Sequence, residues 1–251
     1  MKFIVGVLIV YCMTFSLVSC DGDDDFNSSH PAFPNALVTV KPLEGGGFYM
    51  QLDDSTTLYP DNVSKSPYGS KEVRALVNYR EVDPAKYSDG QSDAISYTKH
   101  VTLNWIDSIL TKPVVAYPAE GAEDKYGNDP LEIVKDWTTV AEDGYLTLRF
   151  RTRWGGNTVH YINLLTGKNP DNPYEVELRH NAYGDLNGRT GDALVAFKIK
   201  DISDADMKTV KLTMKYMSFS GEKTITIDFS NGKIQSSSEQ IETAEYSSSI
   251  K

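Results

Sequence analysis

Cys20 is the residue whose surroundings indicate a specific chemistry most directly. It ends the run LVSC (residues 17–20), and Lys2 and an almost unbroken apolar stretch lie upstream of that run. A positive residue, an apolar stretch too short for a stable membrane span and then a small residue are typical of a secretory signal. A cysteine thiolate behind a small residue can be alkylated by a diacylglycerol donor, as in the bacterial lipobox. We therefore expect cleavage after residues 1–19 and lipid on Cys20. The alternative is an ordinary signal peptide with a chance cysteine.

A cluster of acids directly follows this cysteine. Its members are Asp21, Asp23, Asp24 and Asp25. Like charges repel, so the simplest interpretation is an extended, solvated spacer, and we expect residues 20–35 to form an acidic and polar tether. The cluster also resembles the export signal found after the lipid-bearing cysteine of surface lipoproteins in gut and oral anaerobes. That resemblance implies an outer-membrane lipoprotein that faces the cell exterior, with an inward-facing location as the alternative.

Catalytic and metal chemistry find little support in the rest of the chain. The four histidines are scattered, and none has a zinc spacing such as H-E-x-x-H. His160 and His180 could meet across neighbouring strands, but two imidazoles bind zinc weakly without a third ligand, and we expect ordinary surface positions for them. The run DLNGRTGD at 185–192 lacks the glutamate of an EF-hand loop and predicts a turn. We therefore predict no metal.

The usual nucleophiles are also missing from the sequence. Cys12 lies in the expected signal, so apart from Cys20 no thiol remains for a disulfide or for catalysis. Residues 96–99 read SYTK, but the S-x-x-K chemistry needs a helix, and a strand is predicted there. The sequence therefore predicts a protein that is not an enzyme and that has no catalytic residue and no cofactor.

Tyrosines and arginines are the candidate ligand contacts. Tyr126, Tyr174 and Tyr183 fall in predicted turns or strand ends, where tyrosine can stack on a sugar or anchor a protein partner. The alternative is that these rings plug the ends of the β domains. A second set consists of Arg149, Arg151 and Arg153, which share one face of a predicted strand. Such a stripe usually pairs with acids on the next strand, and an anionic ligand is the alternative.

The net charge of −10 restricts the partners further. Binding to a phosphate backbone depends on basic patches, so we expect no nucleic-acid partner. We expect the chain to meet the membrane through its lipid and to bind a protein or a glycan.

Period-two patterns dominate the chain after the tether. Residues 36–41 and 47–53 flank a glycine-rich turn, and long β-type segments follow at 72–82 and 95–109. A few short strands without an internal helix predict a small barrel or a compact sandwich over 36–116. The polar, breaker-rich stretch 117–130 predicts a linker.

The second half continues as strands. Residues 144–154 alternate between apolar and polar, and further strand patterns recur up to residue 230. We predict an antiparallel, immunoglobulin-like β-sandwich over 131–234. The serine-rich stretch 235–251 predicts a frayed polar tail.

Taken together, the two halves resemble a known family, the NigD-like lipoproteins. The resemblance rests on the following stretches: LVTVKPLEGGGFYMQLDDSTTLYP, SILTKPVV, EDGYLTLRFRTRWGGNTVHYINLL, YEVELRHNAYGD, ALVAFKI and MKYMSFSGEKTITIDF. It implies an all-β chain with an OB-like barrel followed by a β-sandwich. The family takes its name from a bacteriocin gene cluster, where an immunity role is suspected, and it offers no catalytic residues to transfer.

The function expected from these observations is binding rather than catalysis. We expect a lipid-anchored envelope protein that acts as a binding or interaction module at the bacterial cell surface. Two alternatives remain, a bacteriocin immunity lipoprotein and a periplasm-facing structural lipoprotein.

Overall fold

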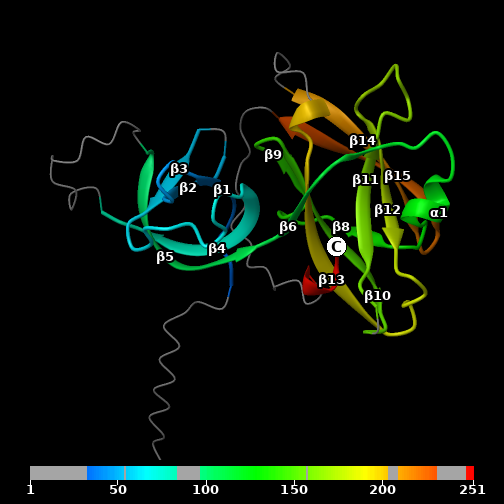
Figure 1. Ribbon diagram of the computed structural model, residues 1–251, viewed down its shortest axis with the longest axis horizontal. Helices are drawn as coiled ribbons and strands as arrows, with labels where there is room; N and C mark the ends of the chain where they lie inside the picture. The colour runs from blue at the N-terminus through cyan, green and yellow to red at the C-terminus, as the bar shows by residue number, and fades with distance from the viewer. Residues whose placement is uncertain (1–32, 54, 84–96, 157, 203–208, 231–246) are drawn as a thin grey trace, which may run out of the picture.

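The computed structural model describes residues 33–53, 55–83, 97–156, 158–202, 209–230 and 247–251 (Figure 1). Cys20 and the aspartates at 21–25 lie outside the described residues. Strands make up most of the described chain, and they form a small closed barrel and a larger sheet. This confirms the predicted all-β class.

The barrel has five strands in the order β1-β2-β3-β5-β4. They are β1 (Ala36–Pro42), β2 (Phe48–Gln51), β3 (Thr57–Pro60), β4 (Val73–Glu81) and β5 (Lys99–Ser108). Strict alternation places Val38, Val40, Met50 and Leu58 inside, where they form the barrel core without exposure to solvent. The pairs are antiparallel except β3–β5, which runs parallel and closes the barrel.

The second half folds ten strands into a sandwich in which β10 and β13 lie toward the barrel and β11, β12 and β14 lie on the far side (Figure 1). The strands are β6 (Leu110–Pro113), β7 (Val115–Ala116), β8 (Glu132–Val134), β9 (Val140–Glu142), β10 (Tyr145–Trp154), β11 (Tyr161–Thr166), β12 (Glu175–Asn181), β13 (Arg189–Lys198), β14 (Thr209–Ser218) and β15 (Gly221–Ser230). Apolar residues from both layers fill one core, among them Leu146, Leu148 and Phe150 of β10. This confirms the predicted sandwich.

The sandwich is not antiparallel throughout. Strand β12 pairs parallel to β14, and β6 pairs parallel to β13. The chain leaves β12, crosses to the opposite layer as β13 and returns as β14, so the two strands on either side of this crossover run in the same direction. The sequence pattern gives the period of each strand but not this connection.

The passage from barrel to sandwich lies at Ile109, which is buried between the two units. Strand β6 directly after it pairs with β13, although the sequence placed residues up to 116 in the barrel. Residues 117–130, which the sequence predicted as a linker, lie against the sandwich. There, Tyr117 N–H donates to the carbonyl of Thr166, and a short helix α1 (Ala122–Tyr126) crosses β12. The polar composition of this stretch reflects a surface crossover.

A buried polar cluster joins the two units. Arg74 of β4 has no exposure to solvent and donates to Thr39 at 2.9 Å, to Thr147 of β10 at 3.3 Å and to the carboxylate of Glu142. The hydroxyl of Tyr145 donates to Glu72 at 2.6 Å. Two of the acceptors of Arg74 belong to the sandwich, so the cluster fixes the barrel against β9 and β10.

The last described residues correct the prediction of a frayed tail at 235–251. Ile250 is only 5% exposed and belongs to the sandwich core. The carbonyl of Ser249 accepts from His160 N–H at 3.0 Å, and Lys251 N–H donates back to the His160 carbonyl at 2.8 Å. Burial of Ile250 and these hydrogen bonds together dock Ser247–Ser249 (η3) and the two residues that follow it against the sandwich. Residues 235–246 lie outside the described residues.

Candidate ligand-binding site

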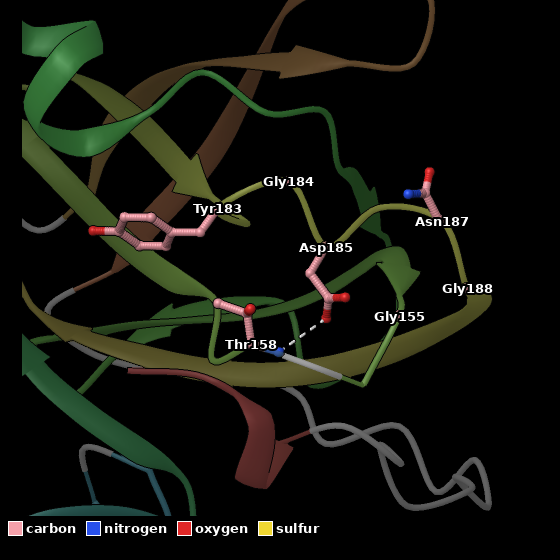
Figure 2. A pocket seen from close by; sticks show the side chains of 7 residues that line it. All are labelled: Gly155, Thr158, Tyr183, Gly184, Asp185, Asn187 and Gly188. Carbon is pink, nitrogen blue, oxygen red and sulfur yellow. Dashed lines mark hydrogen bonds between the residues drawn. The ribbon is translucent and has the colours of Figure 1, made fainter.

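Two turns meet at one end of the sandwich and line a cavity of about 460 Å³ that is open to solvent (Figure 2). One turn joins β10 to β11, and the other joins β12 to β13. The cavity is lined by Gly155, Thr158, Tyr183, Gly184, Asp185, Asn187 and Gly188. Of the turn predicted at 185–192, residues 185–188 form a turn, and β13 begins at the next residue, Arg189.

Asp185 holds the two turns together. Its side chain is only 5% exposed, and one carboxylate oxygen accepts from Gly156 N–H at 3.0 Å and from Thr158 N–H at 3.4 Å, the latter drawn in Figure 2. A methyl group on Gly155 would lie 2.0 Å from the other oxygen, so only glycine fits there. These contacts hold the two turns close together at the cavity.

A buried histidine pair lies beneath this end. Nε2 of His180 is 3.0 Å from Nδ1 of His160, and the ring of Trp154 stacks on His160 with centroids 4.3 Å apart. Both histidines are at most 1% exposed, so the predicted surface positions are wrong. The register pairs His180 with inward-facing Ile162, and counting residues by twos along each strand places both imidazoles inside. This two-residue periodicity was the feature of the sequence that could have predicted the burial of both histidines.

Burial sets the protonation of the pair. It lowers the pKa of His180 to about 4, with a further contribution from neighbouring His160, and it lowers the pKa of His160 despite the carboxylate of Asp185. Both rings are neutral at pH 7 and cannot touch a ligand in the cavity. Within the described ranges, no group of three or more His, Cys, Asp or Glu side chains could hold a metal ion.

Aromatic surface lies at the rim of the cavity. Tyr183 is 60% exposed and Tyr161 is 38% exposed, and their rings meet nearly at right angles with centroids 5.5 Å apart. The backbone of Tyr183 has a positive φ of 49°, and its N–H donates to Oδ1 of Asn181 at 2.9 Å. In Figure 2 the ring points away from the Asp185 carboxylate, along the outside of the sandwich. The turn thus holds an aromatic pair in solvent.

The other two predicted tyrosine contacts lie elsewhere. Tyr174 directly precedes β12 and packs against the sandwich core, whereas Tyr183 follows the other end of that strand, about 30 Å away at a strand rise of ~3.3 Å per residue. Tyr126 ends α1, half-buried, with the ammonium of Lys125 5.1 Å from its ring centroid. The structure therefore does not bring the three predicted tyrosines together.

The arginine stripe is present on the outer face of β10. Asp192 of β13 accepts from Arg149 Nε at 2.8 Å and from Arg151 Nε at 2.5 Å, and Arg149 also reaches Asp136 at 3.1 Å. Burial opposes ionisation of Asp192, but the hydrogen bonds from both arginines lower its pKa overall. Arg153 instead lies over the ring of exposed Phe219. Two of the three cations are thus paired with acids.

Comparison with known proteins gives two family matches, one to the barrel and one to the sandwich. The NigD-like N-terminal OB domain matches residues 37–109, and the NigD-like C-terminal beta sandwich domain matches residues 113–229. The chain belongs to the NigD-like family. The boundary between the two matches falls where the chain leaves the barrel.

Several solved structures are similar to this NigD-like chain. A suspected toxin-related protein from Parabacteroides distasonis is 32% identical, with 78% of this chain and 92% of that chain covered and a TM-score of 0.61. A protein of unknown function from Bacteroides vulgatus is 21% identical, with 86% and 98% covered and a TM-score of 0.62. A NigD-like immunity protein from Bacteroides caccae is 17% identical, with 84% and 92% covered and a TM-score of 0.53. The last two show the fold alone.

No curated protein matches this NigD-like chain. Among the described residues, no helix is both long and apolar enough to cross a membrane.

Proposed function

We propose that this NigD-like protein is a non-catalytic, lipid-anchored envelope protein that binds a partner at the cell surface through the end of its sandwich. The observation that carries the proposal is the contacting pair Tyr161 and Tyr183, exposed beside the cavity. Exposed rings in contact present a large apolar area with hydroxyl groups at its edge. Such rings are enriched in binding surfaces because they lose little entropy on binding.

The turns around the pair support binding rather than a purely structural role. Tyr183 has a left-handed backbone, which costs a non-glycine residue about 1–3 kcal/mol. Asn187 is exposed and lines the same cavity, where its amide can donate to a ligand and accept from it. Asp185 fixes both turns, so a ligand needs to order little of the protein when it binds.

The expected N-terminus gives this module its location. Lipid on Cys20 would anchor the chain, with about 0.8 kcal/mol from each buried CH₂ group. Phe33 and Asn35 are hydrogen-bonded to β4 of the barrel, so the expected tether at 20–35 is shortened to residues 20–32. Thirteen residues could span about 40 Å when extended, enough to hold the folded units clear of the headgroups. The aspartates at 21 and 23–25 support export to the outer face of the outer membrane.

Affinity capture tests the proposal. The full chain is immobilised and exposed to envelope extracts and to a glycan array, beside Tyr183→Ala and the control Phe33→Ala, which removes an exposed ring from the start of the barrel. We expect a specific partner that Phe33→Ala retains and Tyr183→Ala loses. Capture that is equal for all three chains would contradict the proposal, as would turnover of any substrate.

A second candidate function is bacteriocin immunity. The similar fold from Bacteroides caccae carries the name of an immunity protein, at 17% identity. This role predicts that cells without the protein become sensitive to one bacteriocin although no surface ligand is captured.

A further inference from the structure

A row of aromatic rings crosses the outer face of the barrel. In β2 and β3 the inward residues Met50 and Leu58 are paired, which places Tyr49 and Tyr59 opposite each other on the outer face. Tyr59 is in turn paired with His100 of β5. Three neighbouring strands therefore each contribute one ring to a single row.

A fourth ring completes this row. Tyr97, just before β5, stacks on Tyr59 with centroids 4.8 Å apart and planes within 23°, and it lies 5.7 Å from Tyr49. Tyr59 also meets His100 edge to face at 5.5 Å. All four rings are half-buried. We call Tyr49, Tyr59, Tyr97 and His100 the aromatic row.

Three members of the aromatic row lie outside the contact between barrel and sandwich, whereas Tyr49 lies at its edge, because its partner Lys41 binds Asp143 of the sandwich. That contact uses Leu37 of β1, Leu76 and Arg74 of β4 and the far end of β5. Figure 1 shows β3 and the start of β5 on the side of the barrel away from the sandwich. Packing between the two units therefore does not explain the contacting rings of Tyr59, Tyr97 and His100 on this face.

The charges near the aromatic row disfavour a phosphate ligand. Lys99 is bound to Glu81 at 2.6 Å, and Lys41, on the strand beside Tyr49, is bound to Asp143 of the sandwich at 2.8 Å. Neutralised lysines attract a phosphate backbone poorly. Exposed Arg80, opposite Thr102 at the His100 end of the row, is a further cation near this face. A stacking surface whose adjacent lysines are both paired with acids suits a neutral ligand.

The polar groups at the aromatic row suit hydroxyl groups. His100 Nδ1 contacts the Asp61 carboxylate at 2.7 Å, and both side chains remain 31% exposed. Rings that stack on the apolar face of a sugar, with hydroxyls and a carboxylate beside them, match the chemistry of a carbohydrate.

We infer that the aromatic row is a binding site for a neutral oligosaccharide chain, separate from the site at the end of the sandwich. At a strand spacing of ~4.8 Å, a row across three strands spans about 10 Å, close to the length of two linked sugar rings. The same face of OB barrels, on strands 2 and 3, can bind oligosaccharides or oligonucleotides. The paired lysines favour the former here.

Titration calorimetry of the full chain in detergent tests the inference, with neutral glucan, mannan and xylan hexasaccharides as probes. We expect at least one hexasaccharide to bind. Tyr59→Ala and Tyr97→Ala should each weaken its binding about tenfold, and Tyr59→Phe, which keeps the ring, by clearly less. Tyr183→Ala should bind it as the unchanged chain does, even if the proposed site on the sandwich has no ligand.

Three results would overturn the inference. They are no binding of any neutral hexasaccharide, binding that Tyr59→Ala and Tyr97→Ala leave unchanged, and salt-sensitive binding of oligo-dT at the aromatic row in place of sugars. Circular dichroism checks that each variant folds. If Tyr59→Ala does not fold, Tyr49→Ala takes its place, with the same expected loss.

Discussion

Nε2 of His180 lies 3.0 Å from Nδ1 of His160, and the pair is sealed in the sandwich core beneath the turns that carry Tyr183. Its burial links the stability of the sandwich to pH. The pKa of His180 falls from an ordinary value near 6.5 to about 4 in the folded chain. Between these values the unfolded chain binds more protons than the folded chain, so stability must rise with pH in this interval.

We therefore expect the free energy of unfolding to fall as the pH is lowered from 6.5 to 4, by roughly 3 kcal/mol from His180 alone. His180→Gln cannot titrate and should flatten this part of the profile. Denaturant titrations at half-unit steps of pH measure it, with His100→Gln on the barrel surface as the control. An equal slope for His180→Gln and the unchanged chain would contradict the assigned burial.

Arg74 should be the most sensitive residue between the two units. Arg74→Met leaves the Glu142 carboxylate without its buried cation, which we expect to cost roughly 3–5 kcal/mol. Lys99→Met removes a more exposed partner of Glu81 and should cost less than about 1 kcal/mol. Equilibrium unfolding in urea compares the two variants. Similar small losses would show that Arg74 does not hold the units together.

Ile250 should stabilise the sandwich although it lies in a serine-rich segment. Ile250→Ala opens a gap in the core, for which we expect a loss of about 2–4 kcal/mol. Ser248→Ala, at an exposed neighbour, should change the melting temperature little. Calorimetry of both variants decides the matter. If the two melt alike, residues 247–251 do not contribute to the folded core.

The strand pattern was readable in the sequence because burial on one face imposes a period of two. The alternation in residues 144–154 corresponds to β10, which begins at Tyr145. The sequence analysis expected acids on a neighbouring strand to pair with the arginine stripe, and the register places Asp192 of β13 opposite Arg151. The sequence alone did not identify this aspartate, because the register between β10 and β13 is set by the fold. The serine-rich composition of residues 235–251 led to the wrong prediction of a frayed end for residues 247–251. There, the single apolar residue Ile250 packs into the sandwich core.

The sites were harder to predict than the strands. The cavity is lined by Asp185 and Gly155, which belong to two different turns. Only the topology of the sandwich brings these two turns together. The aromatic row depends on which strands are neighbours in the barrel, since Tyr59 and His100 are far apart in the sequence. Parity along each strand identifies which face a ring occupies, but register across strands is set by closure of the whole barrel.

The envelope location rests on the N-terminus. Metabolic labelling with a clickable palmitate should mark the unchanged chain, and Cys20→Ser should lose both the label and membrane association, because no other thiol follows residue 20. Protease added to intact cells should remove the folded units. Replacing Asp23, Asp24 and Asp25 with alanine should protect them. Label retained on Cys20→Ser, or an unchanged chain that resists external protease, would contradict this location.

Photo-crosslinking on intact cells tests the central claim, that the end of the sandwich binds a surface partner. A benzoylphenylalanine is placed at Asn187, which lines the cavity beside Tyr183, and in a matched chain at Phe33 on the barrel. We predict one discrete adduct from position 187 that disappears when Tyr183→Ala is added and that is absent from position 33. No adduct at 187, or the same adducts from both positions, would contradict the claim.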